Sequence, residues 1–463
     1  MSVISPAALV SADAPEAATA TPVWFVGPKG VLTPAAQTWA NRMGFKGKAG
    51  EVLVVPGADG VIDHVLVGAG KTFDPTSARA LSAKLPSGIY RLEAEPEDAR
   101  VAALAFLLGR YVFDRYRTRD RPEVRLVAPD GLDVAEALCI ASACALAREM
   151  VDTPPADMGP LQMETIAREI AEAHGASISV ITGDDLLEEN YPAIHAVGRA
   201  AAPHRAPRII EIGWNLDKTD RPLVALVGKG VAFDTGGLDI KSAAGMRNMK
   251  KDMGGAAHVL ALARLVMQAG LDVRLVVLVA AVENAISGDA FRPGDVLQSR
   301  KGLTIEIGNT DAEGRLILAD ALARAGEHDP DLTLDFATLT GAARIALGPE
   351  LPALYTDDEA LAGDLLAAAD AVRDPLWRMP LWPGYRTAID SEIADVRNDS
   401  AAWAQGGSIT AALFLQKFAP TGGAWAHLDV FAWNSRGRPG HPEGGEAQSL
   451  RAAYAMLKAR YAG

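Results

Sequence analysis

The sequence has few cysteines and no long apolar run, and both absences narrow the class of protein. Only Cys139 and Cys144 occur among 463 residues, too few for a disulfide framework, which indicates a reducing compartment. No stretch reaches the ~18 apolar residues that a membrane-spanning helix needs. The first basic residue is Lys29, so the N-terminus resembles neither a secretory signal nor a transit peptide. We expect a cytoplasmic protein whose residues 1–22 form a disordered arm.

Positive charge is also scarce. The chain has 45 Lys and Arg against 58 Asp and Glu, a formal net charge of −13 and a pI near 5.2. Such an acidic protein is poorly suited to bind nucleic acid or anionic membranes. Hydrophobic residues make up 49% and charged residues 22%, the composition of a globular protein. The length predicts two or three domains.

The pattern of apolar residues predicts a small α/β domain followed by a larger one. Apolar, glycine-bounded runs at 51–57 and 63–70 read as strands, and residues 98–113 have helical spacing. A long helix covers 133–150 and must end before Pro154 and Pro155. We therefore divide the chain into an N-terminal α/β domain (1–130), a connecting helix (131–152) and a catalytic domain (153–463).

The larger domain alternates strands and helices. Continuous apolar runs at 222–228, 273–282 and 332–339 are typical of strands covered on both faces, whereas 254–270 and 314–328 are typical of helices. This order predicts a mostly parallel central sheet. The fold class is therefore α/β, with a small domain and a larger one.

Charged residues gather where predicted strands end. In open α/β sheets the active crevice lies beyond the carboxyl ends of the strands. The segment after 222–228 carries Lys229, Asp234, Lys241 and Asp252, and the segment after 302–308 carries Asp311, Glu313 and Arg315. Four carboxylates offer enough oxygen ligands for two divalent ions such as Mn²⁺, Mg²⁺ or Zn²⁺. Composition alone leaves two readings open, a dimetal site or structural salt bridges.

Other catalytic motifs are missing. The sequence has no HExxH, no GxSxG and no Cys–His signature, which argues against zincin, serine and cysteine hydrolases. A phosphate-binding loop fails as well, because the pattern GxxxxGK[ST] is absent. The eight histidines are scattered, and we expect His427 to be structural.

Two segments resemble a known family. The signature of the leucyl (cytosol) aminopeptidases stands unaltered in NTDAEGRL (309–316), and residues 227–257, VGKGVAFDTGGLDIK…MKKDMGGAA, resemble that family's other metal-binding block. Further blocks in the same order are DFATLTGA (335–342), PLWRMPLW (375–382), GSITAALFL (407–415) and WAHLDV (425–430). The resemblance spans about residues 148 to 433.

The resemblance implies a metal-dependent aminopeptidase with two ions per subunit, Mn²⁺ or Zn²⁺. It places the tightly held ion on Lys229, Asp234, Asp252 and Glu313. It places the exchangeable ion on Asp234, Asp311 and Glu313, so that two carboxylates bridge. A lysine ligand must be neutral, and two adjacent dications lower its pKa.

The resemblance also implies the remaining roles. Lys241 would stabilise the developing oxyanion, and Arg315 would hold a bicarbonate that serves as general base. Asp252 would bind the α-amino group of the peptide. The other substrate-binding residues implied are Met249, Asn309, Thr338, Leu339 and Gly341. A Met-lined pocket suits Leu or another apolar first residue.

The C-terminal segment 434–461 and the stretch 397–407 depart from the family pattern. The last part of the specificity pocket is therefore not carried over. The resemblance further implies a homohexamer acting on peptides. Two alternatives are a family member with a DNA-binding or regulatory role, which the acidic charge disfavours, and another two-metal hydrolase such as a phosphatase.

Overall fold

The computed structural model describes residues 4–30, 32–400 and 403–462. The chain forms two compact units. The larger unit contains Leu146–Trp433 and Gly444–Gly463, and the smaller contains Ser2–Ala145 and Asn434–Glu443. The boundary between the two units falls within helix α4 (Val134–Asp152), which belongs to the smaller unit up to Ala145 and to the larger unit from Leu146. None of the helices in the described ranges is long and apolar enough to span a membrane.

The larger unit is built on an eight-stranded sheet in the order β15-β14-β17-β13-β9-β10-β8-β7. Its central strands β17, β13, β9 and β10 are parallel to one another. The antiparallel pairs are β8 with β10, β7 with β8, and β14 with β17. The predicted mostly parallel sheet is thus confirmed. The strands are β7 (Ser177–Thr182), β8 (Arg208–Trp214), β9 (Leu223–Asp234), β10 (Arg274–Asn284), β13 (Leu332–Ala337), β14 (Ala353–Tyr355), β15 (Trp377–Arg378) and β17 (Ala424–Asp429).

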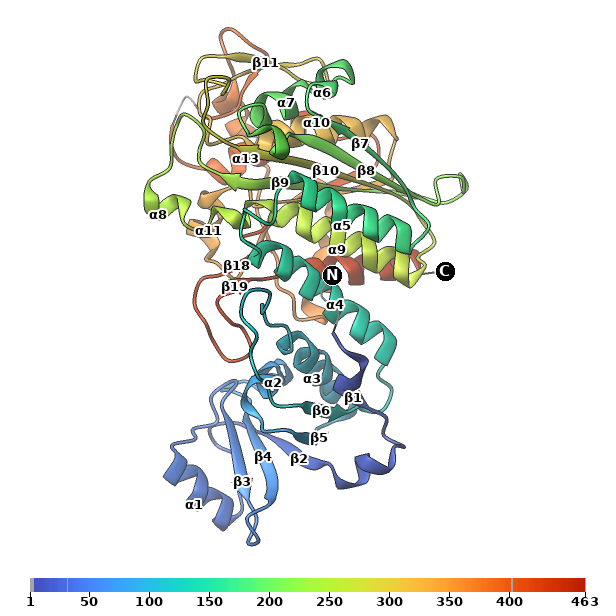
Figure 1. Cartoon of the computed structure of the whole chain (residues 1–463), viewed down its shortest axis with the longest axis vertical. Helices are drawn as coiled ribbons and strands as arrows, with labels where there is room; N and C mark the ends of the chain where they lie inside the picture. Colours follow the sequence, from blue (N-terminus) through green and yellow to red (C-terminus); the bar gives the residue numbers. More distant parts are fainter. Residues whose placement is uncertain (1–3, 31, 401–402, 463) are drawn as a thin grey trace. The chain divides into compact units, whose positions relative to one another are not determined.

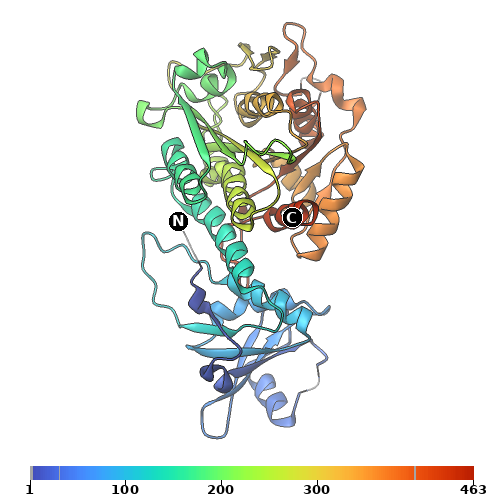
Figure 2. The same ribbon diagram turned by 90° about the vertical axis from the view of Figure 1, so that its right-hand side faces the viewer.

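Helices cover both faces of this sheet. Figure 1 shows α5 and α9 on one face and α7, α10 and α13 on the other, which explains why the central strands are buried and mostly apolar. Figure 2 shows the C-terminal helix α14, in red, beside the orange α12, and these two helices pack together. The helices are α5 (Pro160–Ala173), α6 (Asp185–Glu188), α7 (Pro192–Gly198), α8 (Ala243–Met246), α9 (Gly254–Ala269), α10 (Gly314–Glu327), α11 (Gly341–Leu347), α12 (Glu359–Ala371), α13 (Gly407–Phe418) and α14 (Leu450–Tyr461).

Short elements complete the larger unit. Strands β11 (Val296–Gln298), β12 (Thr304–Glu306) and β16 (Val396–Arg397) form a three-stranded sheet. Strands β18 (Trp433–Asn434) and β19 (Gly444–Gly445) pair where the chain leaves the larger unit and re-enters it. The 3₁₀ helices are η4 (Pro203–Arg205), η5 (Met249–Met253) and η6 (Pro383–Ile389).

The smaller unit has a six-stranded sheet in the order β1-β6-β5-β2-β4-β3, parallel except for β3. Its strands are β1 (Leu9–Val10), β2 (Thr21–Val26), β3 (Val52–Pro56), β4 (Ile62–Gly68), β5 (Gly88–Glu93) and β6 (Val124–Val127). Its helices, besides the first part of α4, are η1 (Pro6–Ala8), η2 (Pro15–Thr19), α1 (Pro34–Met43), η3 (Pro75–Ala80), α2 (Leu81–Lys84) and α3 (Pro96–Gly109).

The disordered arm predicted for residues 1–22 is wrong for its described part, since residues 1–3 lie outside the described range. Strand β1 pairs with β6, and Val10 and Ala17 are buried against Val127. Burial of these apolar side chains supplies the free energy that orders the segment.

The smaller unit also contains a segment from near the C-terminus, 434–443. The Nε of Arg79 donates a 2.7 Å hydrogen bond to the carbonyl of Gly440. A Cβ on Gly50 would come within 2.6 Å of Pro439. The segment that departs from the family pattern therefore packs closely on residues that precede it by hundreds of positions.

Candidate metal centre

Strand β9 carries two predicted ligands, Lys229 and Asp234, and both are buried. The Nζ of Lys229 lies 2.7 Å from Asp252 Oδ2 and 2.9 Å from Glu313 Oε1. A Cβ on Gly314 would come within 2.5 Å of Lys229 Cε. Glycine at the start of α10 therefore leaves the space that the lysine chain occupies.

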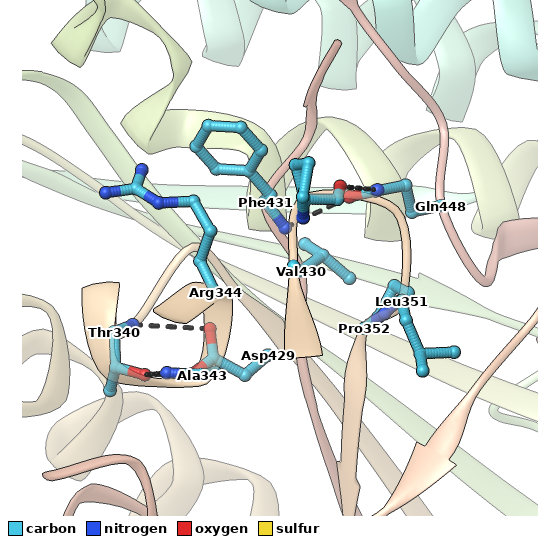
Figure 3. Close-up of a pocket in the computed structure, with 11 residues that line it drawn as sticks. Thr340, Ala343, Arg344, Leu351, Pro352, Asp429, Val430, Phe431 and Gln448 are labelled. Carbon is cyan, nitrogen blue, oxygen red and sulfur yellow. Dashed lines mark hydrogen bonds between the residues drawn. The ribbon is translucent and has the colours of Figure 1, made fainter. Parts of the chain in front are cut away.

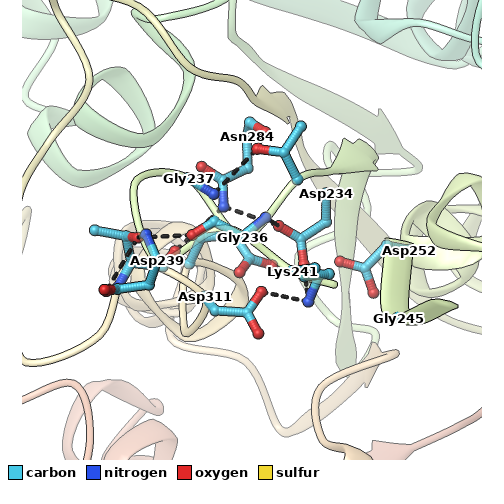
Figure 4. Close-up of polar contacts among 12 residues, drawn as sticks. Asp234, Gly236, Gly237, Asp239, Lys241, Gly245, Asp252, Asn284 and Asp311 are labelled. Carbon is cyan, nitrogen blue, oxygen red and sulfur yellow. Dashed lines mark hydrogen bonds and ion pairs between the residues drawn. The ribbon is translucent and has the colours of Figure 1, made fainter. Parts of the chain in front are cut away.

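The loop after β9 turns back on Gly236 and Gly237, whose φ angles are 90° and 65°. Only glycine adopts this left-handed region without strain. The turn brings Lys241 to the cluster, where its Nζ lies 2.8 Å from Asp234 Oδ2 and pairs with Asp311 (Figure 4). The second lysine thus bridges two carboxylates from separate loops.

The remaining carboxylates come from the starts of helices. Asp252 lies in η5, and Glu313 directly precedes α10. One oxygen from each of Asp234, Asp252 and Glu313 lies within 4.8 Å of the others, and all three residues are buried. Asp311 has a side chain that is 33% exposed and joins this group through Lys241. The structure therefore brings together all five residues predicted as metal ligands.

Burial and mutual repulsion perturb these carboxylates. Burial and the neighbouring Asp234 raise the pKa of Glu313 to about 8 and that of Asp311 to about 6. Burial opposes ionisation of Asp252 as well, but Lys229 holds the pKa of that carboxyl below its usual range. In the protein without metal ions, the carboxylates of the cluster therefore carry more negative charge than the neighbouring lysines neutralise.

The donor set fits divalent metal ions. Asp252 Oδ2, Asp311 Oδ1 and Glu313 Oε1 are buried and accept no hydrogen bond from the described residues; only lysine ammonium groups stand within ion-pair distance. Oxygen atoms of this kind bind Mn²⁺, Mg²⁺ or Zn²⁺. In the metal-free protein burial disfavours the charge of Lys229, but Asp252 and Glu313 raise its pKa above the ordinary value. Its amine becomes a ligand only when bound ions displace that proton.

Three further residues position the cluster, and the sequence analysis missed them. Asn284, at the end of β10, donates to Asp234 Oδ1 at 2.8 Å and to the carbonyl of Thr310 at 3.2 Å. Asp239 accepts from the amide of Thr310 at 2.8 Å, and Thr310 Oγ1 donates to the carbonyl of Gly236 at 2.6 Å. These bonds join the loop after β9 to the 309–313 loop (Figure 4). Of these three residues, Asn284 alone could have been found from the sequence, because it is a polar residue at the end of an apolar strand.

Two cavities adjoin the cluster. One has a volume of about 400 Å³ and contains all the predicted ligands, together with the predicted substrate-binding residues Met249, Thr338, Leu339 and Gly341. The other has a volume of about 350 Å³ and is lined by Asn309 and Arg315. Asp311, Leu339, Thr340 and Gly341 line both. Asn309 is therefore beside the first cavity and not in its wall.

Asp429, at the end of β17, holds the loop between β13 and α11. Its carboxylate accepts bonds from the amide of Leu339 at 3.0 Å and from the hydroxyl of Thr340 at 2.7 Å. Thr338 Oγ1 in turn donates to Asp252 Oδ1 at 2.8 Å. The cavity wall is thus fixed to both the sheet and the carboxylate cluster.

Arg315 is a partly buried cation in the wall of the second cavity. Its Nη1 donates to the carbonyl of Asn398 at 2.6 Å, while its Nε finds no partner among the described residues. Burial lowers the pKa of Arg315 to about 10, which leaves it protonated at neutral pH. Such a guanidinium suits a small planar oxyanion bound through paired hydrogen bonds.

Comparisons with known proteins agree with this geometry. Residues 145–453 match the catalytic domain of the cytosol aminopeptidase family, and residues 24–129 match the N-terminal domain of M17 aminopeptidases. The chain belongs to the cytosol aminopeptidase family. A probable cytosol aminopeptidase of Rhodococcus opacus is 37% identical over 92% of this chain and 89% of its own length.

Solved structures of the family share the whole fold. The crystal structure of the cytosol aminopeptidase from Coxiella burnetii matches with a TM-score of 0.90 and 43% identity, over 98% of this chain and 99% of that one. BotP, a bottromycin maturation enzyme in complex with Mn, matches with a TM-score of 0.85 and 34% identity, over 95% and 99%. This cytosol aminopeptidase is therefore a metal-dependent hydrolase that removes N-terminal residues from peptides.

Proposed function

We propose that this cytosol aminopeptidase works with two divalent metal ions, Mn²⁺ or Zn²⁺, held by Lys229, Asp234, Asp252, Asp311 and Glu313. The observation that carries the proposal is the set of three buried carboxylates whose oxygens lie within 4.8 Å of one another at the wall of a cavity of about 400 Å³. When bound, two such ions lower the pKa of a water molecule and polarise the scissile carbonyl.

The remaining side chains position the peptide and stabilise charge. Asp252 accepts hydrogen bonds from the free α-amino group, which restricts cleavage to N-termini. The ammonium of Lys241 stabilises the negative charge that develops on the carbonyl oxygen, an effect worth ~10²–10³ in rate. Burial opposes its charge, but Asp234 raises the pKa of Lys241 above the ordinary value, so that this lysine remains a cation.

The general base in this proposal is a bicarbonate held by Arg315. All four carboxylates of the cluster are assigned to metal ions, and Arg315 itself stays protonated. A bound base contributes ~10²–10⁴ in rate. In degassed buffer, added bicarbonate should therefore raise turnover of the wild type, and Arg315→Ala should lose this response while it keeps its metal ions. Equal wild-type turnover with and without bicarbonate would refute this part.

We further infer that Leu and other apolar first residues are accepted, because Met249 and Gly341 offer apolar contact beside the cluster. Asn309 and Leu339 support the site through hydrogen bonds. The amide of Asp311 donates to Asn309 Oδ1, and the amide of Leu339 donates to Asp429. The family resemblance also supports a homohexamer in the cytoplasm. Light scattering tests the assembly, since a stable monomer near 48.6 kDa would contradict it.

A direct assay tests the function itself. Leu-p-nitroanilide and p-nitrophenyl phosphate are compared with added Mn²⁺, and with a chelator. We expect cleavage of the anilide only, abolished by the chelator. Cleavage of the phosphate ester alone would support another two-metal hydrolase and reject the aminopeptidase proposal.

A further inference from the structure

The cavity of about 400 Å³ contains three side chains that have no role in the metal chemistry. Besides the predicted ligands and Met249, it is lined by Lys251, Arg344 and Phe431. Two of these are cations, although a pocket for leucine needs none. Their surroundings indicate what the first side chain of the substrate must satisfy.

Lys251 is a buried ammonium whose one ion pair among the described residues is with a shared carboxylate, that of Asp252. Its side chain is 7% exposed, and its Nζ lies 3.4 Å from Asp252 Oδ1. The same carboxyl group already contacts the Nζ of Lys229 at 2.7 Å and the hydroxyl of Thr338 at 2.8 Å. The Lys251 Nζ also lies 5.6 Å from the ring centroid of Phe431. One carboxylate thus serves two ammonium groups, and Lys251 keeps capacity for a further anionic partner.

Arg344 contacts the same aromatic ring. It lies on α11, and its Cζ is 4.7 Å from the ring centroid of Phe431. No hydrogen bond or ion pair of its guanidinium is found with any residue that the structure describes. Figure 3 shows the Arg344 and Phe431 side chains extending in the same direction from their backbones. Two cations therefore contact one ring in the wall of one cavity.

We propose that this cavity selects an acidic first residue, with Lys251 and Arg344 binding its carboxylate. The inference rests on the proposed function, because it assigns the cavity to the first side chain of the peptide. Met249 and Phe431 contact the apolar stem, while an ammonium and a guanidinium donate charge-assisted hydrogen bonds to the carboxylate. A lysine or arginine in that position meets two like charges.

A neutral first residue is accepted but gains less. Leucine covers Lys251 without offering it a hydrogen-bond acceptor, so the ammonium keeps Asp252 as its partner and gains no second acceptor for its remaining donors. Sites built to hydrogen-bond a polar group discriminate strongly against analogues that lack it. We therefore expect kcat/KM to be highest for Glu as the first residue, lower for Gln and Leu, and lowest for Lys, in place of the apolar preference expected from Met249.

The test compares four substrates that differ only in the first side chain, the p-nitroanilides of Glu, Gln, Leu and Lys. Gln matches Glu in shape and lacks only the charge. We expect the wild type to cleave the Glu substrate with at least ~10-fold higher kcat/KM than the Gln substrate, since hydrogen bonds to a charged group are stronger than those to a neutral amide. Lys251→Met and Arg344→Gln should each remove most of that ratio. Arg344→Glu, at an exposed position, should favour the Lys substrate over the Glu substrate.

Lys250→Met is the matched control. Lys250 precedes Lys251 in η5, but its Nζ donates to the carbonyl of Asp152 at 2.5 Å and lies 5.3 Å from the ring centroid of Trp433, and it does not line the cavity. The Glu/Gln ratio should stay at the wild-type value.

The outcomes separate the two proposals. If the Leu and Gln substrates are cleaved but the Glu/Gln ratio is 1 or lower and both Arg344 variants leave it unchanged, the acidic preference is wrong and the aminopeptidase function stands. If none of the four substrates is cleaved with Mn²⁺ or Zn²⁺, the function itself fails. Should Lys251→Met not fold, the two Arg344 variants decide alone.

Discussion

Both units of this cytosol aminopeptidase are α/β structures on mostly parallel sheets, but they bury different side chains. In the larger unit, charged groups from β9, η5 and the start of α10 meet inside the protein. In the described part of the smaller unit, Arg79 is the only charged residue among the buried ones. Among the described residues, buried carboxylates that could hold a metal ion gather in the larger unit.

The difference lies in how the buried charges are satisfied. Arg79 donates to the carbonyl of Gly440 within its own unit, so its role is to hold segment 434–443. In the larger unit, buried oxygens of Asp252, Asp311 and Glu313 form ion pairs with Lys229 and Lys241. Burial, together with the repulsion among the four carboxylates that gather around these lysines, raises the pKa values of Glu313 and Asp311, and a further cation would relieve the repulsion. An excess of negative charge therefore distinguishes this cluster from a structural ion pair.

The largest expected effect comes from the two lysines of the cluster. Lys241→Met should keep both ions and lower kcat by ~10²–10³, because the cation that stabilises the oxyanion is gone. Lys229→Met should lose the tight ion and most of the activity. Elemental analysis after desalting, together with Leu-p-nitroanilide kinetics, measures both. Equal metal content and equal activity in the two variants would show that the two lysines are wrongly assigned.

The larger unit also contains a buried ion pair, His427 and Asp335, whose hydrogen bonds within the described part of the chain include none to a proposed metal ligand. We expect this pair to contribute to stability and not to catalysis. His427 Nδ1 lies 2.5 Å from Asp335 Oδ1, and both side chains are fully buried. Breaking such a pair by His427→Gln should cost ~3–5 kcal/mol of unfolding free energy. His328→Gln, at a partly exposed pair with Glu211, is the control and should cost ~0–1 kcal/mol.

The pH dependence of that loss has a definite sign. Burial lowers the pKa of His427, but Asp335 and Asp429 raise it further, so that it ends above the ordinary value. The charged pair therefore stabilises the protein fully below the unfolded-state pKa of ~6.5 and loses this contribution as the pH rises through the folded-state pKa. Urea unfolding at pH 6 and pH 9 should show a larger difference between wild type and His427→Gln at pH 6. A larger difference at pH 9 would contradict the assignment.

The smallest effect is expected in the smaller unit. Arg79→Met leaves the carbonyl of Gly440 without its 2.7 Å donor, which should lower the unfolding free energy by ~1–3 kcal/mol. kcat should stay within about twofold of the wild type, because no residue of the site is changed. A fall in kcat as large as that of Lys241→Met, with the protein still folded, would break the distinction between the two units.

The sequence predicted the parts of the site that local pattern encodes. Lys229 and Asp234 follow an apolar run that forms a central strand, and the signature at 309–316 is contiguous. Glu313 follows β12 of the three-stranded sheet, so its place beside them was implied by the family resemblance and not by a parallel sheet. Contacts between segments that are distant in the sequence could not be predicted in this way. Arg79 and Gly440 are 361 positions apart, and nothing local marks them as partners.

The same limit applies to the pocket. Lys251 resembles any lysine near a helix start, and Arg344 and Phe431 belong to segments that only the folded sheet brings together. The sequence therefore indicated an apolar pocket from Met249 alone. Its cations could not be predicted, because Lys251 of η5, Arg344 of α11 and Phe431 after β17 come together only where the folded chain encloses one cavity.

The central claim is that the carboxylate cluster holds two metal ions needed for catalysis. Metal-free protein, verified by elemental analysis, is titrated with Mn²⁺ or Zn²⁺ while bound ions and Leu-p-nitroanilide turnover are measured together. We predict no turnover without metal and two ions per chain at full activity, with Asp234→Asn unable to reach that stoichiometry. Full turnover of verified metal-free protein would contradict the account.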